Sequence, residues 1–500
     1  MTLACVQSRA LLGLAAPAVT VEVHLANGLP SLSLVGLADV EVKEARERVR
    51  CALQNSGLEF PSNKRITVNL APADLPKDSG RFDLPIALGI LAASGQIPLE
   101  ALHGWEFAGE LSLSGALRPV RGGLVSSLHG GDQRLVLPLD SAREAALAPA
   151  AQVFGAAHLL DVVAHLLGQP GGEGWQRITA QAPVQRTSGP DLADVKGQVQ
   201  AKRALEIAAA GGHGLLLVGP PGAGKSMLAQ RFSSLLPAMT EQEALESAAV
   251  ASLAGRFDPQ EWGLRPTSAP HHTASAVALV GGGSPPRPGA ISLAHHGVLF
   301  LDEFPEFARS ALEALREPLE NGHITIARAA LSSQFPARFQ LLAAMNPCPC
   351  GFHGSTQRPC RCSPQQIGRY QGKLSGPLLD RIDLHVHVPA LPAQELLQAP
   401  TGESSAAIRQ RVVQARQRAV ARQGGANQQL HGQQLEAVLQ LEPAAHALLH
   451  KAAERLAWSA RATHRTLRVA RTIADLAGGE GIASAHVAEA IQYRNVLLKN

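Results

Sequence analysis

"LLLVGPPGAGKSMLAQRF" (residues 215–232) begins with four apolar residues, passes through a glycine-rich turn and continues in a helix-like pattern. The apolar start predicts a buried strand. The turn matches the spacing G-x-x-x-x-G-K-S, in which backbone N–H groups turn inward around phosphates. Lys225 is placed to reach the outer phosphates and Ser226 to bind Mg²⁺. The phosphate-binding residues that this spacing predicts are Gly219, Pro220, Pro221, Gly222, Ala223, Gly224, Lys225 and Ser226.

A second stretch, "GVLFLDE" (297–303), predicts the acidic half of the same site. Its apolar residues indicate a buried strand, and two carboxylates follow that strand directly. Asp302 is placed to hold the water shell of Mg²⁺, and Glu303 to polarise an attacking water. An exposed acidic strand end is the alternative, which the phosphate loop upstream disfavours.

Three further polar residues are candidates for completing the site. "FQLLAAMNP" predicts a third strand that ends at Asn346, whose amide would orient water or the outermost phosphate. "LSGPLLDRIDLHV" places Arg381 at a helix end, from which an arginine can reach the nucleotide of a neighbouring subunit. Arg461 begins a helix in the last region of the chain. A surface salt bridge is the alternative for either arginine.

Length and composition bound the architecture. A chain of 500 residues exceeds one ordinary core and predicts two to four domains. Its net charge of +4 is too small to indicate a nucleic-acid partner by itself. "LLGLAAPAVTV" (11–21) resembles the core of a signal peptide, but Pro17 interrupts it and an alternating strand pattern follows. Because no run of 18 apolar residues occurs, we expect a cytoplasmic protein without a membrane partner.

The chain divides into three patterned regions and a linker. Residues 1–167 mix strand and helix patterns, with a strand in "KRITVNLAP" and a helix in "DVEVKEARERVRCALQNSG" that ends at Gly57. Residues 168–190 are rich in Gly, Pro and Gln without apolar period, which predicts a linker. Residues 191–395 alternate helix and strand patterns, which predicts a parallel sheet. Residues 403–500 are helical in pattern and predict a small bundle.

The ordered motifs resemble those of AAA+ ATPases, and the segments around the acidic strand resemble the magnesium-chelatase branch of that class. "PHHTASAVALVGGG", "PGAISLAHHGVLFLDEFPEF" and "ALREPLENG" carry this resemblance. The separation of 77 residues (302 − 225) leaves room for the inserted segments of that branch. With "GLPSLSLVGLADVEVKEARERVRCALQNSG" (28–57) at the front, residues 1–495 resemble the YifB/ComM family of magnesium-chelatase-like ATPases.

That resemblance implies an α/β and α+β multidomain fold. It consists of a Lon-protease-like α+β domain, an AAA+ core with a P-loop and a parallel sheet, and a C-terminal helical lid. It implies ATP and Mg²⁺ as cofactors and a homo-oligomeric ring, expected to be a hexamer. By the same resemblance Asn346 is the first sensor, Arg381 a finger acting across subunits and Arg461 the second sensor. Arg465 and Arg468, one and two turns on, are the alternatives for the second sensor.

Two stretches of the front region resemble the catalytic motifs of Lon-type proteases, with both catalytic positions replaced. In "LPKDSGRFDLP" (75–85) the serine position, four residues after Lys77, holds Arg81. The position of the activating lysine, directly after "GGL", holds Val125. Ser79 stands two residues early, and no lysine is placed to take its proton. We therefore expect a folded domain without protease activity, serving as a binding or assembly platform.

Four of the six cysteines lie in "NPCPCGFHGSTQRPCRC", with the spacing C-x-C-x9-C-x-C. Four thiolates satisfy the tetrahedral preference of zinc, and a reducing compartment favours metal over a disulfide. This spacing is less diagnostic than paired C-x-x-C motifs, so free thiols remain an alternative. His353 is a substitute candidate ligand. The predicted structural zinc ligands are Cys348, Cys350, Cys360 and Cys362.

"GHITIARAALSSQFPARFQLLAA" predicts a β-hairpin with its tip near Ser332 and Ser333. Hairpins before the first sensor line the central pore in rings of the class that the chain resembles. Arg328 and Arg338 would then face the backbone phosphates of branched or single-stranded DNA. An ordinary surface hairpin is the alternative.

Resemblance to ComM-type proteins implies a DNA helicase or branch-migration motor in recombination or natural transformation. The main alternative is a magnesium-chelatase motor subunit that drives metal insertion into a porphyrin. Such subunits resemble the chain only from about residue 190, so the front region argues against that alternative. A non-enzymatic assembly scaffold is a third interpretation, which the complete ATP motifs disfavour.

Overall fold

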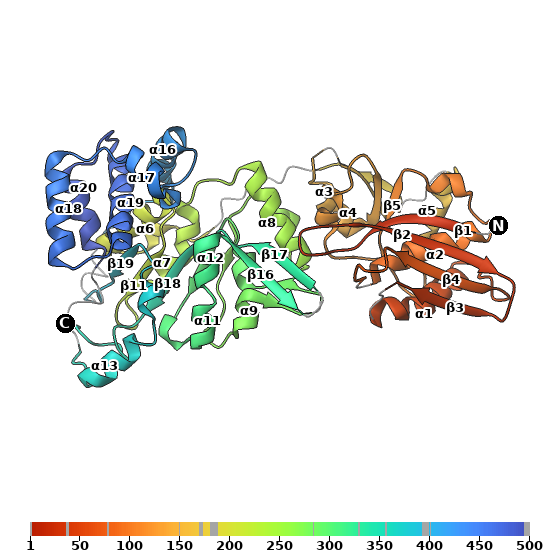
Figure 1. The fold of residues 1–500 in the computed structure, drawn as a ribbon, viewed down its shortest axis with the longest axis horizontal. Helices are drawn as coiled ribbons and strands as arrows, with labels where there is room; N and C mark the ends of the chain where they lie inside the picture. Colours follow the sequence, from red (N-terminus) through yellow and green to blue (C-terminus); the bar gives the residue numbers. More distant parts are fainter. Residues whose placement is uncertain are drawn as a thin grey trace.

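The computed structural model places three regions in a row: a front domain, a parallel-sheet core and a helical end (Figure 1). Ser79 and the side chain of Arg328, both singled out above, lie outside the described residues. The structure describes residues 3–36, 40–77, 80–149, 151–169, 174–180, 189–283, 285–328, 331–355, 358–392, 400 and 402–494.

The front domain is built on an eight-stranded mixed sheet in the order β10-β9-β8-β5-β1-β2-β4-β3. Alternate residues of β1, β2 and β4 are buried, as expected for strands with one face on a core. The predicted strand in "KRITVNLAP" is thereby confirmed as β4. The strands are β1 (Leu3–Arg9), β2 (Ala18–Ala26), β3 (Ser31–Val35), β4 (Arg65–Ala71), β5 (Trp105–Phe107), β8 (Arg134–Pro138), β9 (Gln152–Ala156) and β10 (Gln176–Ile178), with a small pair β6 (Glu110–Leu111) and β7 (Leu117–Arg118).

Helices cover this sheet. The helix α2 (Asp83–Ala93) is buried along its whole length and packs on β1 and β2. Gly89 permits this close approach, because a Cβ there would lie 2.4 Å from a methyl group of Val23. The predicted helix before Gly57 is found as α1 (Val40–Asn55). The remaining helices are α3 (Gly123–Leu128), α4 (Leu139–Ala145) and α5 (Leu159–Leu166).

The predicted linker contains a strand. β10 pairs antiparallel with β9 and forms an edge of the front sheet, so residues 176–178 belong to the front domain. Trp175 anchors this segment by stacking on His165 at 4.1 Å between ring centres. The sequence did not predict this strand, because its apolar residues Trp175 and Ile178 stand among polar residues and do not alternate with a period of two.

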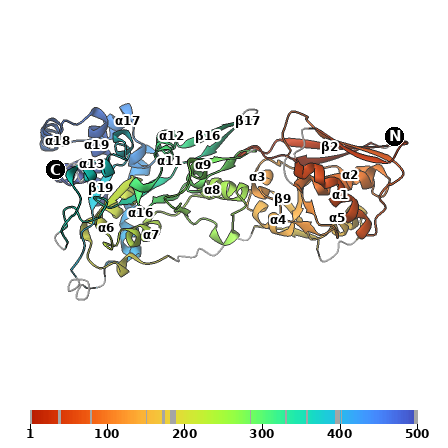
Figure 2. The same ribbon diagram turned by 90° about the horizontal axis from the view of Figure 1, so that it is seen from below.

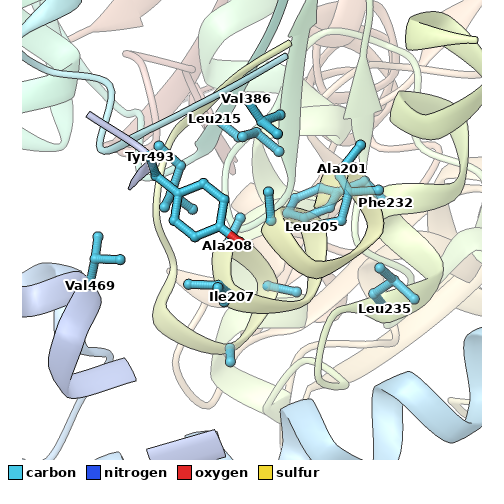
Figure 3. Packing of buried hydrophobic residues seen from close by; sticks show 14 of the residues in the cluster. Ala201, Leu205, Ile207, Ala208, Leu215, Phe232, Leu235, Val386, Val469 and Tyr493 are labelled. Carbon is cyan, nitrogen blue, oxygen red and sulfur yellow. The ribbon is translucent and has the colours of Figure 1, made fainter. Parts of the chain in front are cut away.

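The core is a five-stranded parallel sheet in the order β12-β15-β18-β11-β19. α6 (Val199–Gly211) packs against it with an almost wholly apolar face, as Figure 3 shows. The strands are β11 (Leu215–Val218), β12 (Thr267–Ser268), β15 (Val298–Leu301), β18 (Gln340–Met345) and β19 (Leu384–His387). α7 (Lys225–Phe232) follows β11 directly, and α8 (Glu241–Leu253) extends toward the front domain (Figures 1 and 2). Cluster members labelled in Figure 3 include Leu205, Ile207, Ala208, Leu215, Phe232, Val386, Val469 and Tyr493.

A hairpin, β16 (His323–Arg328) and β17 (Leu331–Pro336), precedes β18. Its turn was predicted too late: Ser332 and Ser333 lie within β17, opposite Ala327 and Ile326. The reason is side-chain alternation, because Ser333 and Phe335 are buried on the same face as Ile326. Other elements around the sheet are α9 (Ala276–Val280), β13 (Gly281–Gly282), β14 (Arg287–Pro288), α10 (Ala290–Leu293), α11 (Arg309–Glu313), α12 (Arg316–Asn321), α13 (Pro364–Gln371) and α14 (Gly376–Leu379).

The helical end confirms the predicted bundle. α19 buries residues on most of its length, while α16 contributes one buried face and packs on α6. The helices are α16 (Ser405–Gln423), α17 (Gly432–Val438), α18 (Pro443–Arg455), α19 (Ala460–Ala477) and α20 (Ser484–Gln492). None of the helices in the described part of the chain combines the length and apolarity needed to cross a bilayer.

The front domain joins the core through α8. Leu245 and Ala249 of α8 share an apolar cluster with Leu124 and Val125 of α3. The backbone N–H of Gly122 donates to the carbonyl of Ser252 at 3.2 Å. A cavity of about 420 Å³ lies beside this junction, between the β1–β2 turn, the β13–β14 segment and the hairpin.

Candidate functional site

The carboxyl ends of the core strands meet around one pocket of about 630 Å³. Lys225 and Ser226 follow β11, Asp302 and Glu303 follow β15, and Asn346 follows β18. In a parallel sheet these ends share one edge, which is where ligands bind in open α/β folds. The structure therefore brings together the predicted residues of three separate motifs. The pocket is lined by residues 221–227, 269–272, Phe300, Asp302, Glu303, Met345 and Asn346.

Glycines shape the phosphate loop between β11 and α7. Gly222 and Gly224 have φ of +76° and +90°, and a Cβ at either would meet no atom within 4 Å. Glycine adopts this left-handed backbone without steric penalty, and it leaves the loop's surface open to a ligand. Gly219 serves the opposite side: a Cβ there would lie 2.1 Å from the carbonyl oxygen of Val388. The loop thus packs closely on Val388, the residue after β19, on one side and is open on the other.

Lys225 connects the phosphate loop with the end of β18. Its ammonium donates to the carbonyls of Gly219 (2.8 Å) and Pro220 (2.9 Å), and to the Oδ1 of Asn346 (3.1 Å). Burial lowers the pKa of Lys225, while the negative charges of Asp302 and Glu303 oppose this shift. Gly219 and Pro220 therefore take part through carbonyls that hold the lysine, behind the pocket surface.

Ser226 and Asp302 are adjacent, as the predicted magnesium ligands should be. The hydroxyl of Ser226 donates to the Oδ2 of Asp302 at 2.6 Å. Two oxygen donors at this distance, beside a glycine-rich phosphate loop, fit the hard-ligand preference of Mg²⁺. The other carboxylate oxygen of Asp302 accepts from the backbone N–H of Glu303 at 2.9 Å, which fixes its orientation.

Glu303 occupies an unusual backbone position. Its φ is +52°, in the left-handed region that side-chain-bearing residues rarely adopt. Its side chain is 54% exposed, and one oxygen lies 2.9 Å from the Nδ1 of His272. Backbone strain of this kind gathers at functional sites, where surrounding contacts sustain it. The strained turn directs the carboxylate into the pocket opening.

Sequence reasoning missed two contributors to this site. His272 comes from the loop after β12, and β12 is only two residues long, so no apolar run marked it as a strand of the sheet. Gln198 holds the phosphate loop from the side, because its amide donates to the carbonyls of Ala223 (3.1 Å) and Pro389 (2.7 Å). The paired histidines of "PHHTASAV" were a usable signal for the first; nothing marked the second.

The two predicted arginines lie together but outside this pocket. Arg381 donates to the carbonyl of Pro377 at 2.6 Å and pairs with Glu320 of α12. Arg461 pairs with the same carboxylate at 3.1 Å and is exposed. Neither lines the pocket at the strand ends of its own chain, which we call the nucleotide pocket after its predicted ligand. Arg465, by contrast, is largely buried and lies 3.8 Å from Asp383. The roles assigned to Arg381 and Arg461 therefore stay predictions.

The four clustered cysteines gather their sulfurs at one point. Sγ–Sγ distances are 3.4 Å for Cys348–Cys350, 3.6 Å for Cys348–Cys360 and 3.5 Å for Cys350–Cys360, with Cys362 in the same group. A tetrahedral ion with bonds of about 2.3 Å needs sulfurs about 3.8 Å apart, so the group could hold a metal ion. His353 directs its backbone N–H to Cys348 at 3.4 Å, and its ring is outside the group.

In the front domain the charged residues of the protease-like motif are turned inward. Arg81 is 1% exposed and donates to the hydroxyl of Ser126 at 2.8 Å. Lys77 is also 1% exposed and its ammonium donates to the carbonyl of Pro72. Val125, at the position of the activating lysine, packs against α8 of the core. In this arrangement the motif residues form packing and domain contacts.

Of the predicted DNA contacts, Arg338 is exposed and stands two residues after the end of β17. Its backbone is held firmly, since its N–H donates to the Nδ1 of His295 at 3.1 Å and its carbonyl accepts from His296 at 2.6 Å. Only Gly297 separates these histidines from β15, so the segment after the hairpin is held at the start of the strand that Asp302 follows.

Three family models match the chain in succession. The model described as "Subunit ChlI of Mg-chelatase" matches residues 21–140. That described as "Magnesium chelatase, subunit ChlI" matches residues 191–396. "Magnesium chelatase, subunit ChlI C-terminal" matches residues 402–494.

Relatives that match the chain over nearly its full length belong to the same class of protein. The competence protein ComM of Haemophilus influenzae is 51% identical over 501 residues, covering 99% of this chain and 98% of that protein. A protein named YifB from Salmonella typhimurium is 48% identical, with the same coverage of both chains. A shorter similarity, 30% over 133 residues, joins 27% of this chain to 14% of the maternal DNA replication licensing factor mcm3 of Xenopus laevis.

Proposed function

The chain belongs to the ComM/YifB family of magnesium-chelatase-like AAA+ proteins, and from that premise we propose that it is an ATP-hydrolysing ring motor acting on DNA. ATP and Mg²⁺ use follows from the family. The single observation that carries hydrolysis is the convergence of Lys225, Ser226, Asp302 and Asn346 on one pocket, with Glu303 at its opening. Residues suited to bind phosphate, two candidate magnesium ligands and a candidate base then lie together.

We assign the roles of the pocket residues from their positions, and those of the two arginines from the resemblance to AAA+ ATPases. Lys225 neutralises charge on the outer phosphates, and Ser226 with Asp302 holds Mg²⁺. Glu303 polarises the attacking water, and Asn346 orients it or the outermost phosphate. Arg381 acts across a subunit boundary in a homo-oligomer, expected to be a hexamer, and Arg461 is the proposed second sensor. Because Arg381 pairs with Glu320 within its own chain, reaching a neighbour requires exchanging that partner.

The boundaries proposed for the working units are 1–167, 191–395 and 403–500, with the front unit extended to take in β10. The front unit is proposed to act as an inactive protease-like platform. Its support is the burial of Arg81 and the use of Val125 as a contact with α8.

DNA is the proposed substrate, in a helicase or branch-migration reaction during recombination or transformation. Support comes from the name of one relative, a competence protein, and from the local similarity to a DNA replication licensing factor. The hairpin β16–β17 would present Arg338 and Arg328 to the phosphate backbone. Contacts of this kind give affinity without reading sequence and weaken steeply with salt.

The test is ATPase rate against concentration of a four-way DNA junction. We expect stimulation in the wild type, and loss of stimulation with intact DNA-free hydrolysis in the Arg328→Ala/Arg338→Ala variant. The log–log slope of DNA affinity against salt should become shallower by about 0.7–0.9 for each phosphate contact removed. Arg50→Ala/Arg143→Ala removes equal charge from exposed front-domain sites, 52% and 63% exposed, and should leave stimulation unchanged.

One alternative is favoured by a specific observation: all three matching family models carry magnesium-chelatase descriptions, including the one over the front region. The front region alone therefore does not separate a chelatase motor from a DNA motor. A nucleotide-bound wild type that fails to bind DNA at low salt would remove the DNA proposal and leave the chelatase-type motor as the better interpretation.

A further inference from the structure

We infer that the four-cysteine loop, with zinc bound, is a buttress that fixes the conformation of the phosphate loop, so that metal occupancy sets nucleotide affinity. The inference rests on the proposed function only in that the pocket binds a nucleotide. It concerns two segments far apart in the chain, residues 348–362 and 219–226.

The contact is made by Gly351, which lies between the two pairs of cysteines. Gly351 is buried with φ of +85°, and a Cβ there would lie 2.5 Å from the Cδ and 2.7 Å from the Cγ of Pro221. Pro221 belongs to the phosphate loop and lines the nucleotide pocket. The backbone of the cysteine loop therefore packs on the proline ring more closely than any side-chain-bearing residue would allow.

The cysteine loop is itself well anchored at this point. Cys348 is fully buried, and its carbonyl accepts from the N–H of Gly351 at 2.9 Å. The preceding residue, Pro347, is held by the amide of Gln371 at 3.0 Å. Asn346, the residue before Pro347, accepts a hydrogen bond from the ammonium of Lys225 through its Oδ1. A zinc ion joining Cys348 to the second cysteine pair would close the loop and reduce its conformational freedom.

The phosphate loop thus has supports on two sides. Gln198 holds the carbonyl of Ala223 from one side, and Gly351 packs on Pro221 from another. The glycines within the loop, Gly222 and Gly224, supply no side-chain packing of their own. Without the second support the loop samples more conformations, and a nucleotide must then select the binding-competent one. Apparent affinity falls in proportion to the population of that conformation.

The experiment compares Gly351→Ala with Gly354→Ala, a matched control in the same loop. Gly354 also has a left-handed φ, of +75°, but a Cβ there would meet no atom within 4 Å. Both substitutions share the backbone penalty, and only Gly351→Ala displaces Pro221. Zinc content is measured by metal analysis, and affinity by titration with a fluorescent ADP analogue. We expect Gly351→Ala to keep about one zinc per chain and to bind the analogue at least 10-fold more weakly. Gly354→Ala should match the wild type in both.

Two further variants distinguish positioning from general damage. In Gly351→Ala/Pro221→Ala the ring is gone, so affinity should return to that of Pro221→Ala alone. Cys360→Ser/Cys362→Ser should lose zinc and bind at least as weakly as Gly351→Ala. Three outcomes would each overturn the inference. The first is equal nucleotide affinity in Gly351→Ala and Gly354→Ala. The second is loss of zinc in Gly351→Ala but not in Gly354→Ala, and the third is wild-type nucleotide affinity in Cys360→Ser/Cys362→Ser after its zinc is lost. A wild type that holds zinc but binds no nucleotide would instead refute the proposed function.

Discussion

In the nucleotide pocket the candidate catalytic carboxylate faces solvent, whereas in the front domain the charged residues of the protease-like motif are enclosed. Glu303 is 54% exposed on a strained turn, while Arg81 and Lys77 are each 1% exposed. Burial alone does not make the difference, because Lys225 is only 8% exposed and still lines the nucleotide pocket. Arg81 and Lys77 line neither that pocket nor the cavity beside the domain junction. Motif-like charge in the sequence therefore marks a site only where the side chain borders a pocket that a ligand can enter.

The two regions also differ in what surrounds them. The nucleotide pocket is bounded by strand ends of one sheet, so a common scaffold positions its polar groups. The front-domain motif lies at a junction: Glu144 accepts from Gly123 of its own domain (2.8 Å) and from Ser252 of α8 (2.9 Å). What a protease would use as a catalytic face here fastens one domain to another.

The largest expected difference between the two regions is the effect of substitutions on the rate of ATP hydrolysis. Lys225→Ala should weaken nucleotide binding, because it removes the cation at the outer phosphates. Glu303→Gln should keep binding and lower ATP turnover by about 10²–10⁴-fold, the range for a lost general base. Ser126→Ala, in the front domain, should leave turnover unchanged. Steady-state hydrolysis and analogue binding measure both; wild-type turnover in Glu303→Gln would refute the role of the acidic strand.

Arg381 tests whether the pocket is complete within one chain. Arg381→Ala should lower turnover by about 10³-fold or more, the scale of an arginine finger. If it acts on a neighbour, mixing Arg381→Ala chains with Lys225→Ala chains should recover partial activity, because some interfaces then combine an intact pocket with an intact arginine. Mixed rings that form at every ratio without recovery would speak against a role across the boundary.

A smaller effect is expected at His272, the positioning residue beside Glu303. His272→Ala should lower kcat several-fold and leave analogue affinity unchanged, because the strained carboxylate loses the contact that aims it. His272→Asn, which retains a donor, should recover part of the loss. His103→Ala, at an exposed histidine of the front domain, is the control, because the ring of His271 packs on that of His272 at 4.1 Å and cannot be removed independently. A change in affinity equal to the change in kcat would contradict the positioning role.

The smallest effect is a pH dependence of stability at the domain junction. Burial raises the pKa of Glu144 to about 7, against hydrogen bonds from Ser252 and Gly123 that lower it. Between the ordinary glutamate pKa and about 7 the native chain holds a proton that the unfolded chain has released. Stability therefore falls as pH rises through this window.

We expect the melting temperature to fall by a few degrees between pH 5 and pH 8, and Glu144→Gln to remove that part of the slope. Asp140→Asn, on the same helix and 71% exposed, should keep the wild-type slope. Identical slopes for the wild type and Glu144→Gln would show that the junction does not titrate.

Much of the core was predictable because local pattern and chemistry coincide there. The apolar run before Gly219 predicts β11 and leads into the phosphate-loop motif. The carboxylates after Leu301 follow the apolar run of β15 and predict a metal site at its end. His272 was not predictable, since its strand is only two residues long, and neither was the contact of Gly351 with Pro221, which joins segments 130 residues apart (351 − 221). The hairpin turn was misplaced because serines suggest a turn, while burial of Ser333 follows the alternation of the strand.

The turn between β1 and β2 has a mechanical consequence. A Cβ at Gly13 would lie 3.3 Å from the Cβ of Ser333, so the front domain contacts β17 directly. In Figure 1 the β1–β2 turn extends from the front domain toward the hairpin. A two-stranded hairpin has little stiffness of its own. The hairpin's resistance to bending therefore comes partly from its contact with the front domain, which contributes no residue to the lining of the nucleotide pocket. If the proposed motor function holds, we expect a chain cleaved before residue 191 to keep its predicted hydrolytic residues but to couple ATP hydrolysis less well to movement of the substrate.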